Sequence, residues 1–424
     1  MDNNFSMVEW AAGANIYEVN IRQYTQEGSF NAFAKHLPRL NDMGIKILWL
    51  MPVTPISIEK RQGTLGSYYA CSSYTSINPE FGTMDDFKQF VHDVHAMDMK
   101  IIIDWVANHT GYDHHWVKEN PEYYLKDADG NFTEENGWMD VIDLDYTNND
   151  MRRAMIASMK FWVNECDIDG FRCDMAHLVP LDFWQDARTE CDAVKNLFWL
   201  AECDEPSYLN VFDTSYAWNW MHVSEKLARG EVQLSSMMDV LHIYEAQKDG
   251  PCKLFFTSNH DENSWNGTEY EKYGVASRAF AIFTATWPGM SLIYSGQELP
   301  NYKRLKFFDK DEINWGNEKP SLQEFYKTLF SLRYGNRVLK PGINFFVLTA
   351  DDSNNILSYI FENGDSKILV LINFSSTGKK KITLAHSLMK GGFENIFSGL
   401  QYNFSETESF ELQEWEALVY EGDA

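Results

Sequence analysis

The sequence predicts an α/β fold, a (β/α)8 (TIM) barrel with a short inserted subdomain after its third strand and a separate C-terminal β-domain. Three observations predict it. Up to residue 342, short apolar runs alternate with segments of helical periodicity. One connection in this series is far longer than the others, and from residue 343 only strand patterns remain. Such an alternation is typical of a parallel sheet covered by helices.

Eight apolar runs are the expected barrel strands, at residues 14–24, 45–53, 99–109, 168–177, 197–202, 211–216, 253–262 and 290–296. Between them, residues 84–98 and 151–166 carry apolar side chains at helical spacing. A doubly wound open sheet is the alternative arrangement. It is disfavoured because no glycine-rich nucleotide-binding motif follows the first strand.

The barrel is expected to comprise residues 1–109 and 147–342. Residues 110–146 form the long connection, which is dense in aromatic and acidic residues. Loops longer than about a dozen residues are usually functional, and this one follows a strand at the end of the barrel that carries active sites. Four of its aromatic residues are candidates to line a cleft, although packing is the better expectation for each: Trp116, Tyr123, Tyr124 and Trp138.

Residues 343–424 are expected to form an antiparallel β-sandwich. Short alternating runs are separated there by turn residues, and no helical pattern interrupts them.

The charge balance excludes some partners. The formal net charge is −26 and the isoelectric point is about 4.7, which argues against nucleic acid and anionic membranes. Apolar runs such as residues 45–53 are too short to cross a bilayer. An aromatic content of 15% suits a neutral sugar ligand, but a large core uses aromatic residues as well. Nothing in the sequence predicts the oligomeric state.

The six cysteines form no CxxC pair and no regular framework, so we expect free thiols in a reducing compartment. The first residues are polar and acidic, unlike a signal peptide. A cytoplasmic location is therefore expected; a periplasmic or secreted one is compatible if a signal peptide was removed.

Four of the predicted strands end in polar side chains, and the candidates are Asp104, Asn108, His109, Arg172, Asp174, Glu202, His260 and Asp261. Each has a simple structural explanation on its own, such as a buried histidine, a helix cap or a solvated turn. The carboxyl ends of barrel strands meet on one rim, however. Together these residues predict a single polar site there.

Arg172 and Asp174 point to the chemistry of that site. Residues two apart in a strand face the same way, so the guanidinium is expected to keep the Asp174 carboxylate ionised. Glu202 follows the neighbouring strand, about 4.8 Å away, and its pKa is expected to rise beside an ionised carboxylate. A carboxylate and a carboxylic acid about 5 Å apart are what retaining glycoside hydrolysis requires. A bare surface ion pair is the alternative explanation.

The sequence resembles the alpha-amylase family, glycoside hydrolase family 13, over nearly its whole length. The motifs that carry the resemblance are "DWVANH" (104–109), "GFRCD" (170–174), "AE" (201–202) and "NHD" (259–261), in this order. The stretch "GSYYACSSYTSINPEFGT" (66–83) resembles the family segment that holds a sugar-stacking tyrosine, here Tyr69.

The resemblance implies an α-retaining hydrolase of α-1,4-linked glucans such as starch or maltooligosaccharides. It implies Asp174 as the nucleophile, which forms a covalent glycosyl intermediate, Glu202 as the acid/base, and Asp261 as a third carboxylate that binds the sugar's 2- and 3-hydroxyls. The substrate-binding residues it implies are Tyr69, Asp104, His109, Arg172 and His260. No cofactor is required for this chemistry.

Two departures from the family pattern matter. Residues 175–178 (Met-Ala-His-Leu) replace a Lys-His pair on the acceptor side, and Ala70 stands where the family usually has Asp. Asn108 and Asp143 fall where two family calcium ligands often lie. Two ligands are short of the six or more that calcium takes, so a structural calcium is possible but not favoured.

Three alternatives to α-1,4 hydrolysis remain open. An α-glucanotransferase, or transglycosylase, would use a sugar hydroxyl in place of water on the same scaffold. A non-catalytic glucan-binding protein would use the cleft without turnover. Cleavage of α-1,6 branches or of a disaccharide is the third.

Overall fold

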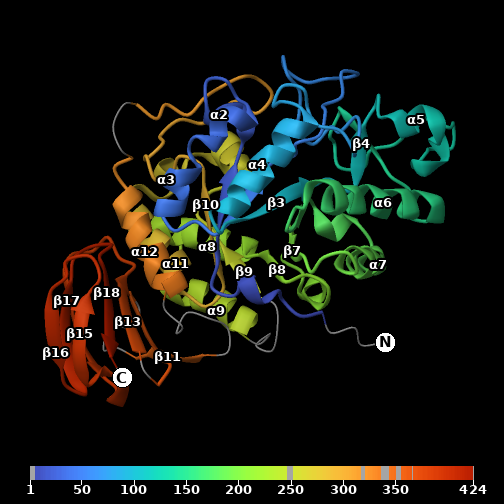
Figure 1. Ribbon diagram of the computed structural model, residues 1–424. Helices are drawn as coiled ribbons and strands as arrows, with labels where there is room; N and C mark the ends of the chain where they lie inside the picture. The colour runs from blue at the N-terminus through green and yellow to red at the C-terminus, as the bar shows by residue number, and fades with distance from the viewer. Residues whose placement is uncertain are drawn as a thin grey trace.

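The computed structural model describes residues 5–245, 252–316, 320–335, 343–349, 355–364 and 366–423. Its centre is a closed barrel of parallel strands in the order β1-β10-β9-β8-β7-β6-β3-β2 (Figure 1). The strands are β1 (Asn15–Val19), β2 (Ile47–Leu50), β3 (Lys100–Trp105), β6 (Gly170–Cys173), β7 (Phe198–Ala201), β8 (Thr214–Tyr216), β9 (Cys252–Phe255) and β10 (Met290–Tyr294). β1 pairs with both β2 and β10. The predicted barrel is therefore confirmed, and the open sheet is excluded.

The barrel strands are short and buried on both faces, which is why they read as continuous apolar runs. All of them except β8 end earlier than expected, and two of these differences concern predicted site residues. β3 stops at Trp105, so His109 begins another strand, and β9 stops at Phe255, so His260 lies beyond it. At the start of β6, a Cβ on Gly170 would lie 2.0 Å from the carbonyl oxygen of Phe198. Only glycine allows β7 to approach this closely.

Helices surround the barrel, except for α5, which lies in the inserted unit described below. They are α1 (Ile21–Tyr24), α2 (Phe30–Ala34), α3 (Leu37–Asp42), α4 (Met84–Ala96), α5 (His115–Glu119), α6 (Asn149–Cys166), α7 (Leu181–Asp192), α8 (Trp218–Ala228), α9 (Leu234–Glu245), α10 (Glu269–Tyr273), α11 (Ser277–Thr286) and α12 (Gln323–Gly335). The helices predicted at 84–98 and 151–166 are α4 and α6. A capping box of Thr83 and Asp86 starts α4, and the Asn148 side chain caps α6.

The chain between β3 and α6 folds into a small unit around the antiparallel pair β4 (His109–Gly111) and β5 (Val141–Asp143). Trp116, Tyr123 and Tyr124 are buried, and the rings of Trp116 and Tyr123 lie 5.4 Å apart. These three aromatic residues pack inside the unit, whereas Trp138 lines the cleft described below. Residues 110–146 remain our proposed limits for this subdomain.

The C-terminal segment forms a six-stranded sheet in the order β11-β12-β13-β18-β15-β16 and a two-stranded sheet of β14 and β17. The strands are β11 (Asn344–Leu348), β12 (Ile356–Glu362), β13 (Ser366–Asn373), β14 (Lys380–Ala385), β15 (Gly391–Asn395), β16 (Gln401–Phe404), β17 (Thr407–Leu412) and β18 (Ala417–Asp423). All paired strands are antiparallel, which confirms the predicted β-domain. The proposed boundary at 342–343 adjoins residues 336–342, which lie outside the described residues.

The β-domain lies beside α11 and α12 in Figure 1. Aromatic rings join it to the barrel: Phe280 of α11 lies 4.9 Å from Phe374, and Trp287 lies 5.1 Å from Tyr359. This packing fixes the domain away from the carboxyl ends of the barrel strands.

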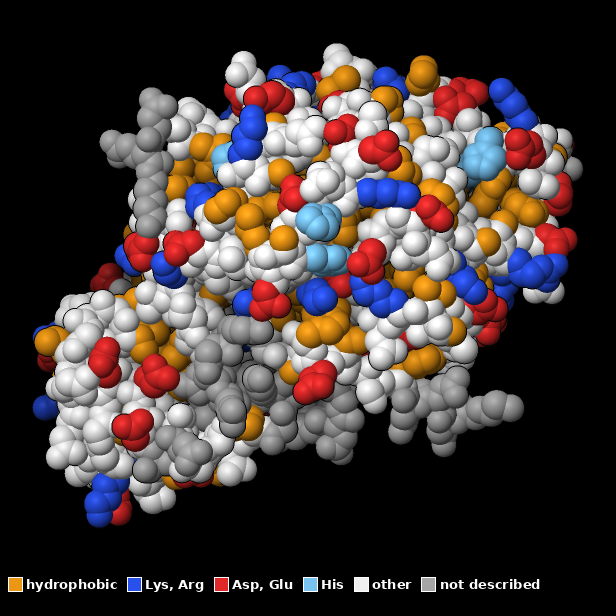
Figure 2. Space-filling model, in the orientation of Figure 1, with side chains coloured by type: hydrophobic (Ala, Val, Ile, Leu, Met, Phe, Trp, Pro, Cys, Tyr) orange, Lys and Arg blue, Asp and Glu red, His pale blue; other side chains and the backbone are white. Residues whose placement is uncertain are grey.

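Acidic and basic side chains are interspersed over the face shown in Figure 2. All six cysteines are free. In the described part of the chain, no helix has the length and apolar character needed to cross a membrane.

Candidate active site

A cleft of 260 Å³ lies at the carboxyl ends of the barrel strands. Its lining includes five residues singled out from the sequence: Tyr69, His109, Asp174, Glu202 and Asp261. The other predicted substrate contacts, Asp104, Arg172 and His260, are buried directly behind them and bonded to them. The structure therefore brings side chains from four strand ends and the segment after β2 to one place.

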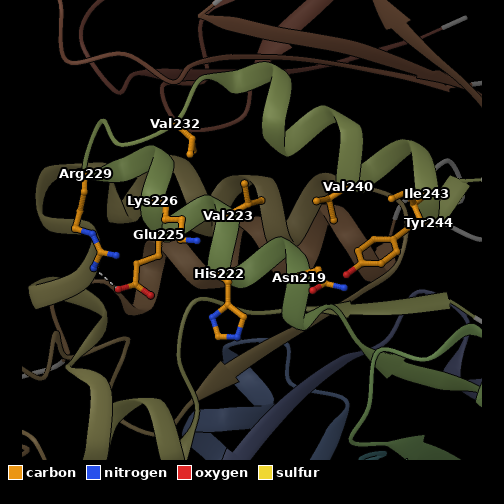
Figure 3. A pocket seen from close by; sticks show the side chains of 10 residues that line it. All are labelled: Asn219, His222, Val223, Glu225, Lys226, Arg229, Val232, Val240, Ile243 and Tyr244. Atoms are coloured by element: carbon orange, nitrogen blue, oxygen red, sulfur yellow. Dashed lines mark hydrogen bonds and ion pairs between the residues drawn. The ribbon is translucent and has the colours of Figure 1, made fainter.

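A larger hollow of 630 Å³ lies between α8 and α9 (Figure 3). None of the predicted site residues lines it. Its charged residues include Glu225 and Arg229, which form an ion pair with each other. The polar cluster at the strand ends is thus the better candidate for chemistry.

Asp174 and Glu202 are the paired carboxylates of the cleft. The β6–β7 register places Cys173 opposite Ala201, and one further residue along brings Asp174 level with Glu202. Backbone bonds continue past the strands, because the Glu202 amide donates to the Cys173 carbonyl at 3.0 Å. The two carboxyl groups therefore stand on adjacent strands at the spacing of one sheet pair, about 4.8 Å between backbones.

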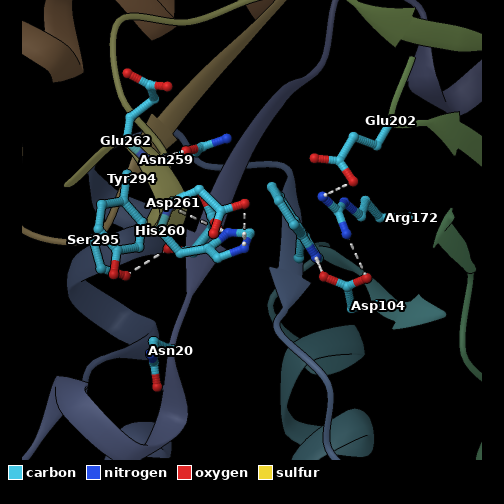
Figure 4. A network of polar contacts seen from close by, with 12 residues as sticks. Asn20, Asp104, Arg172, Glu202, Asn259, His260, Asp261, Glu262, Tyr294 and Ser295 are labelled. Atoms are coloured by element: carbon cyan, nitrogen blue, oxygen red, sulfur yellow. Dashed lines mark hydrogen bonds and ion pairs between the residues drawn. The ribbon is translucent and has the colours of Figure 1, made fainter. Parts of the chain in front are cut away.

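Arg172 binds both of these carboxylates and a third. Its Nη1 donates to Asp104 Oδ1 and Asp174 Oδ1, each at 2.8 Å, and its Nη2 forms an ion pair with Glu202 Oε2 at 2.8 Å. Figure 4 shows the guanidinium between Glu202 and Asp104. Its Nε donates to the Tyr216 hydroxyl. The side chain is fully buried, so its charge is screened little by water.

The balance between burial and this guanidinium sets the pKa values of the pair. Burial raises the pKa of Glu202 to about 7; Arg172 opposes the rise, and the charges of Asp174 and Asp261 add to it. Burial also raises the pKa of Asp174 to about 6, against the attraction of Arg172. Arg172 therefore limits the rise at Asp174 but does not cancel it. The order of the two pKa values matches a proton donor at Glu202 and an ionised carboxylate at Asp174.

The opposite wall carries His260 and Asp261. His260 Nε2 lies 3.3 Å from Asp261 Oδ2 and 2.8 Å from the Tyr69 hydroxyl. The rings of Tyr69 and His260 stack with centroids 5.4 Å apart. Burial alone would raise the pKa of Asp261, but the neighbouring His260 and Arg172 charges lower it below its ordinary value. Asp261 is thus held as a carboxylate facing the cleft.

His109 lines the cleft, and burial lowers its pKa to about 4, so it is a neutral imidazole at neutral pH. Behind it lie the two residues that the sequence offered as calcium ligands. Asn108 Nδ2 donates to Asp143 Oδ1 at 3.3 Å, and the Glu135 amide donates to Asp143 Oδ2 at 3.0 Å. Both carboxylate oxygens of Asp143 already accept hydrogen bonds from the protein. No cluster of three or more acidic, His or Cys side chains that fits a metal occurs among the described residues. Calcium takes six or more oxygen ligands and Asn108 and Asp143 supply two, so a calcium site here stays a prediction that is not favoured.

The model of the alpha-amylase catalytic domain matches residues 13–326. This chain belongs to the alpha-amylase family. The match covers the whole barrel and the insertion, and it ends within α12.

Proteins named as amylases and a protein named as a transferase are similar to this chain. The maltogenic alpha-amylase AmyB of Thermotoga neapolitana, described as noncanonic, is 31% identical with a TM-score of 0.90, covering 97% of this chain and 99% of that one. Alpha-amylase MalA of Haloarcula japonica is 24% identical over 87% of this chain, which spans 56% of that relative's length. An alpha-1,4-glucan:maltose-1-phosphate maltosyltransferase of Picrophilus torridus is 26% identical over 82% of this chain and 59% of its own length. The family thus includes both hydrolases and a transferase by name.

The structure adds residues to the amylase-family site that the sequence did not single out. Aromatic side chains at its mouth are Trp265, Phe307 and Phe308, with Trp265 half-exposed. Trp265 lies in a five-residue π-helical turn and Phe307 and Phe308 lie in a bend, so no periodic pattern marked them. Met175 has a left-handed backbone, φ 40°, and its amide donates to Glu202 Oε2 at 2.8 Å. Such a strained non-glycine residue is common at functional sites. Glu18 of β1, which lies beside His260, is a further residue of the site. It could have been singled out from the sequence, because it is the one acidic residue in an apolar run.

Proposed function

We propose that this protein is an α-retaining glycosidase that cleaves α-1,4 bonds of starch-type glucans or maltooligosaccharides. The observation that carries the proposal is the level placement of Asp174 and Glu202 on adjacent strands with one buried guanidinium between them. A separation of about 5–5.5 Å favours direct attack by a carboxylate, whereas inverting enzymes leave room for a water molecule.

In the first step, the Asp174 carboxylate attacks the anomeric carbon while Glu202 protonates the departing glycosidic oxygen. The bond to the leaving sugar breaks as the bond to Asp174 forms. In the second step, Glu202, now ionised, removes a proton from water, and the resulting hydroxide displaces Asp174. The pKa near 7 allows Glu202 to serve as both acid and base near neutral pH.

The other groups of the cleft bind the sugar. Asp261 is half-exposed to the cleft and held ionised, which suits hydrogen bonds from two adjacent sugar hydroxyls. The Tyr69 ring offers an apolar face to the sugar's C–H bonds. The carboxylates of the cleft also stabilise the positive charge that develops on the sugar in the transition state.

The test compares wild type with Glu202→Gln on maltoheptaose, with the anomeric protons followed by NMR from the first minutes. We expect shorter products that appear first as the α-anomer and vanish in the variant. Products that appear first as the β-anomer would contradict the retaining mechanism. An unchanged rate in Glu202→Gln would contradict the assigned acid/base.

A glucanotransferase is the second candidate, favoured by the maltosyltransferase relative and by the altered residues 175–178. It shares the covalent intermediate and differs only in the acceptor. The same experiment separates the two functions, because a transferase also makes products longer than maltoheptaose.

A further inference from the structure

Glu18 is a buried carboxylate that the mechanism above does not use. It lies at the carboxyl end of β1, level with Trp49 of β2 and Tyr294 of β10, and is fully buried. Its Oε1 lies 2.5 Å from His260 Nδ1 and accepts the His260 backbone amide at 3.3 Å. Its Oε2 is buried without a hydrogen-bond partner. A carboxylate in this position is costly unless a neighbouring charge compensates it.

The hydrogen atoms available around His260 indicate that its ring carries the charge that compensates Glu18. The Tyr69 hydroxyl has one hydrogen, and Asp104 Oδ2 accepts it at 3.0 Å. The Tyr69 oxygen must then accept from His260 Nε2, which lies 2.8 Å away. His260 Nδ1 faces the Glu18 carboxylate, which can only accept when ionised. Burial raises the pKa of Glu18, and the His260 charge opposes this rise. With Glu18 ionised, both ring nitrogens donate, and the ring is an imidazolium.

We propose that Glu18 is a positioning residue, whose buried carboxylate keeps His260 doubly protonated and so directs its Nε2–H toward Tyr69 and Asp261. The chain of donors runs from His260 to Glu18 on one side, and through Tyr69 to Asp104 on the other. Loss of the Glu18 charge would free Nε2 to become an acceptor. It would then repel the Asp261 carboxylate at 3.3 Å instead of binding it.

The charged and titratable groups that face His260 come from several elements. They are Glu18 of β1, Tyr69 after β2, Asp104 of β3, Arg172 of β6 with its charge directed at Asp104, and the adjacent Asp261. The carboxylates outnumber the single guanidinium, so the field at the ring favours the proton. Consistent with this, the charges of Asp261 and Glu18 raise the pKa of His260 well above its ordinary value although burial opposes them.

The decisive measurement is the protonation state of His260 in the intact protein. With 15N-labelled histidine, the two ring nitrogens are followed from pH 5 to 9 and assigned by comparison with His260→Gln. We expect both nitrogens to be protonated at pH 8 in wild type. In Glu18→Gln, one nitrogen should lose its proton at a pH lower by at least about one unit. Glu18→Asp, which keeps the charge, should restore most of the wild-type titration.

The matched control is Glu298→Gln, a buried carboxylate that pairs with Arg39 and Tyr17 away from the cleft. It should leave the His260 titration unchanged even if it lowers the melting temperature. A neutral His260 in wild type at pH 7, with the proton on Glu18, would overturn the proposal. So would a Glu18→Gln titration identical to wild type. If Glu18→Gln does not fold, the wild-type and Glu18→Asp titrations decide.

A kinetic comparison rests on the proposed glycosidase function, whereas the titration does not. On maltoheptaose, Glu18→Gln should raise KM about tenfold, with a smaller change in kcat. A fall in kcat with an unchanged KM would contradict the proposal. If wild type turns over no glucan, the proposed function fails while the NMR result still decides the role of Glu18.

Discussion

Asp174 and Glu202 contact the two terminal nitrogens of one guanidinium: Arg172 Nη1 lies 2.8 Å from Asp174 Oδ1, and Nη2 lies 2.8 Å from Glu202 Oε2. The same cation therefore stabilises the ionised form of both carboxyl groups. It cannot by itself make one an acid and the other a nucleophile. Their difference comes from burial and from the neighbouring carboxylates, which raise the pKa of Glu202 to about 7 and that of Asp174 to about 6.

These pKa values predict a narrow pH optimum. Activity requires Asp174 ionised and Glu202 protonated, so kcat/KM should rise on an acid limb near pH 6 and fall on an alkaline limb near pH 7. Because the two groups interact, the apparent pKa value of each limb describes the pair of carboxyl groups and not one residue alone. A kcat/KM profile with maltoheptaose from pH 4 to 9 measures them. A plateau that extends to pH 9 would contradict Glu202 as the acid.

Glu202→Gln should lower kcat on maltoheptaose by about 10²- to 10⁴-fold, because it removes general acid–base catalysis. An aryl glycoside whose leaving group needs no proton should still form the glycosyl–Asp174 intermediate, which would then accumulate. Intact-protein mass spectrometry would detect it. Asp174→Asn is the control, because it lacks the nucleophile and should show no adduct.

The same substitution should alter how stability depends on pH. The pKa of Glu202 is about 7 in the folded protein and about 4.5 as its ordinary value. Between these values the folded state holds a proton that the unfolded state releases, so this group's contribution to stability is lost as pH rises. At pH 8 the loss is up to about 3 kcal/mol. The melting temperature of Glu202→Gln relative to wild type should therefore increase from pH 5 to pH 8. A constant difference would contradict the raised pKa.

Arg172→Met should destabilise the fold by about 3–5 kcal/mol, because it leaves buried carboxylates without a counter-charge. Arg172→Lys keeps the charge but cannot contact Asp104, Asp174 and Glu202 with separate nitrogens. We expect it to fold and to lose most of its activity. Denaturant unfolding measures the first effect and kcat the second. Full activity in Arg172→Lys would show that separate guanidinium nitrogens on the three carboxylates are not needed.

Chelation should not affect the protein. Asn108 and Asp143 supply two ligands, short of the six or more oxygens that calcium takes, and the oxygens of Asp143 already accept hydrogen bonds from Asn108 and from the Glu135 amide. We expect the same melting temperature and kcat with EDTA and with added CaCl2. A rise in melting temperature on adding calcium would show that Asp143 rearranges to bind it.

Trp265→Ala should raise KM for maltoheptaose several-fold with little change in stability. The ring is 52% exposed at the mouth of the cleft and packs against Phe307 at 5.4 Å, so it offers a stacking face at little structural cost. Trp265→Phe, which keeps an aromatic face, is the matched control. An unchanged KM in Trp265→Ala would place the substrate elsewhere on the rim.

The barrel could be predicted from the sequence because each strand is a continuous apolar run, which burial on both faces requires. The site could be predicted because every barrel strand ends on the same rim, so Asp174 and Glu202 had to meet once β6 and β7 were neighbours. The predicted strand ends were too late at every barrel strand except β8, and by the most at β9, since polar residues after the strands continue the chain without a turn signal.

The sequence by itself determined which residue types reach the rim, since strand periodicity and strand order place them. The sequence also predicted the raised pKa of Glu202, but only the tertiary structure decided the raised pKa of Asp174 and the charges around His260. Arg172 contacts Glu202 as well as Asp174, and Glu18, far away in sequence, faces His260. The reason is physical: a pKa depends on burial and on charges within a few ångströms, and these come from strands whose separation along the chain carries no information about distance.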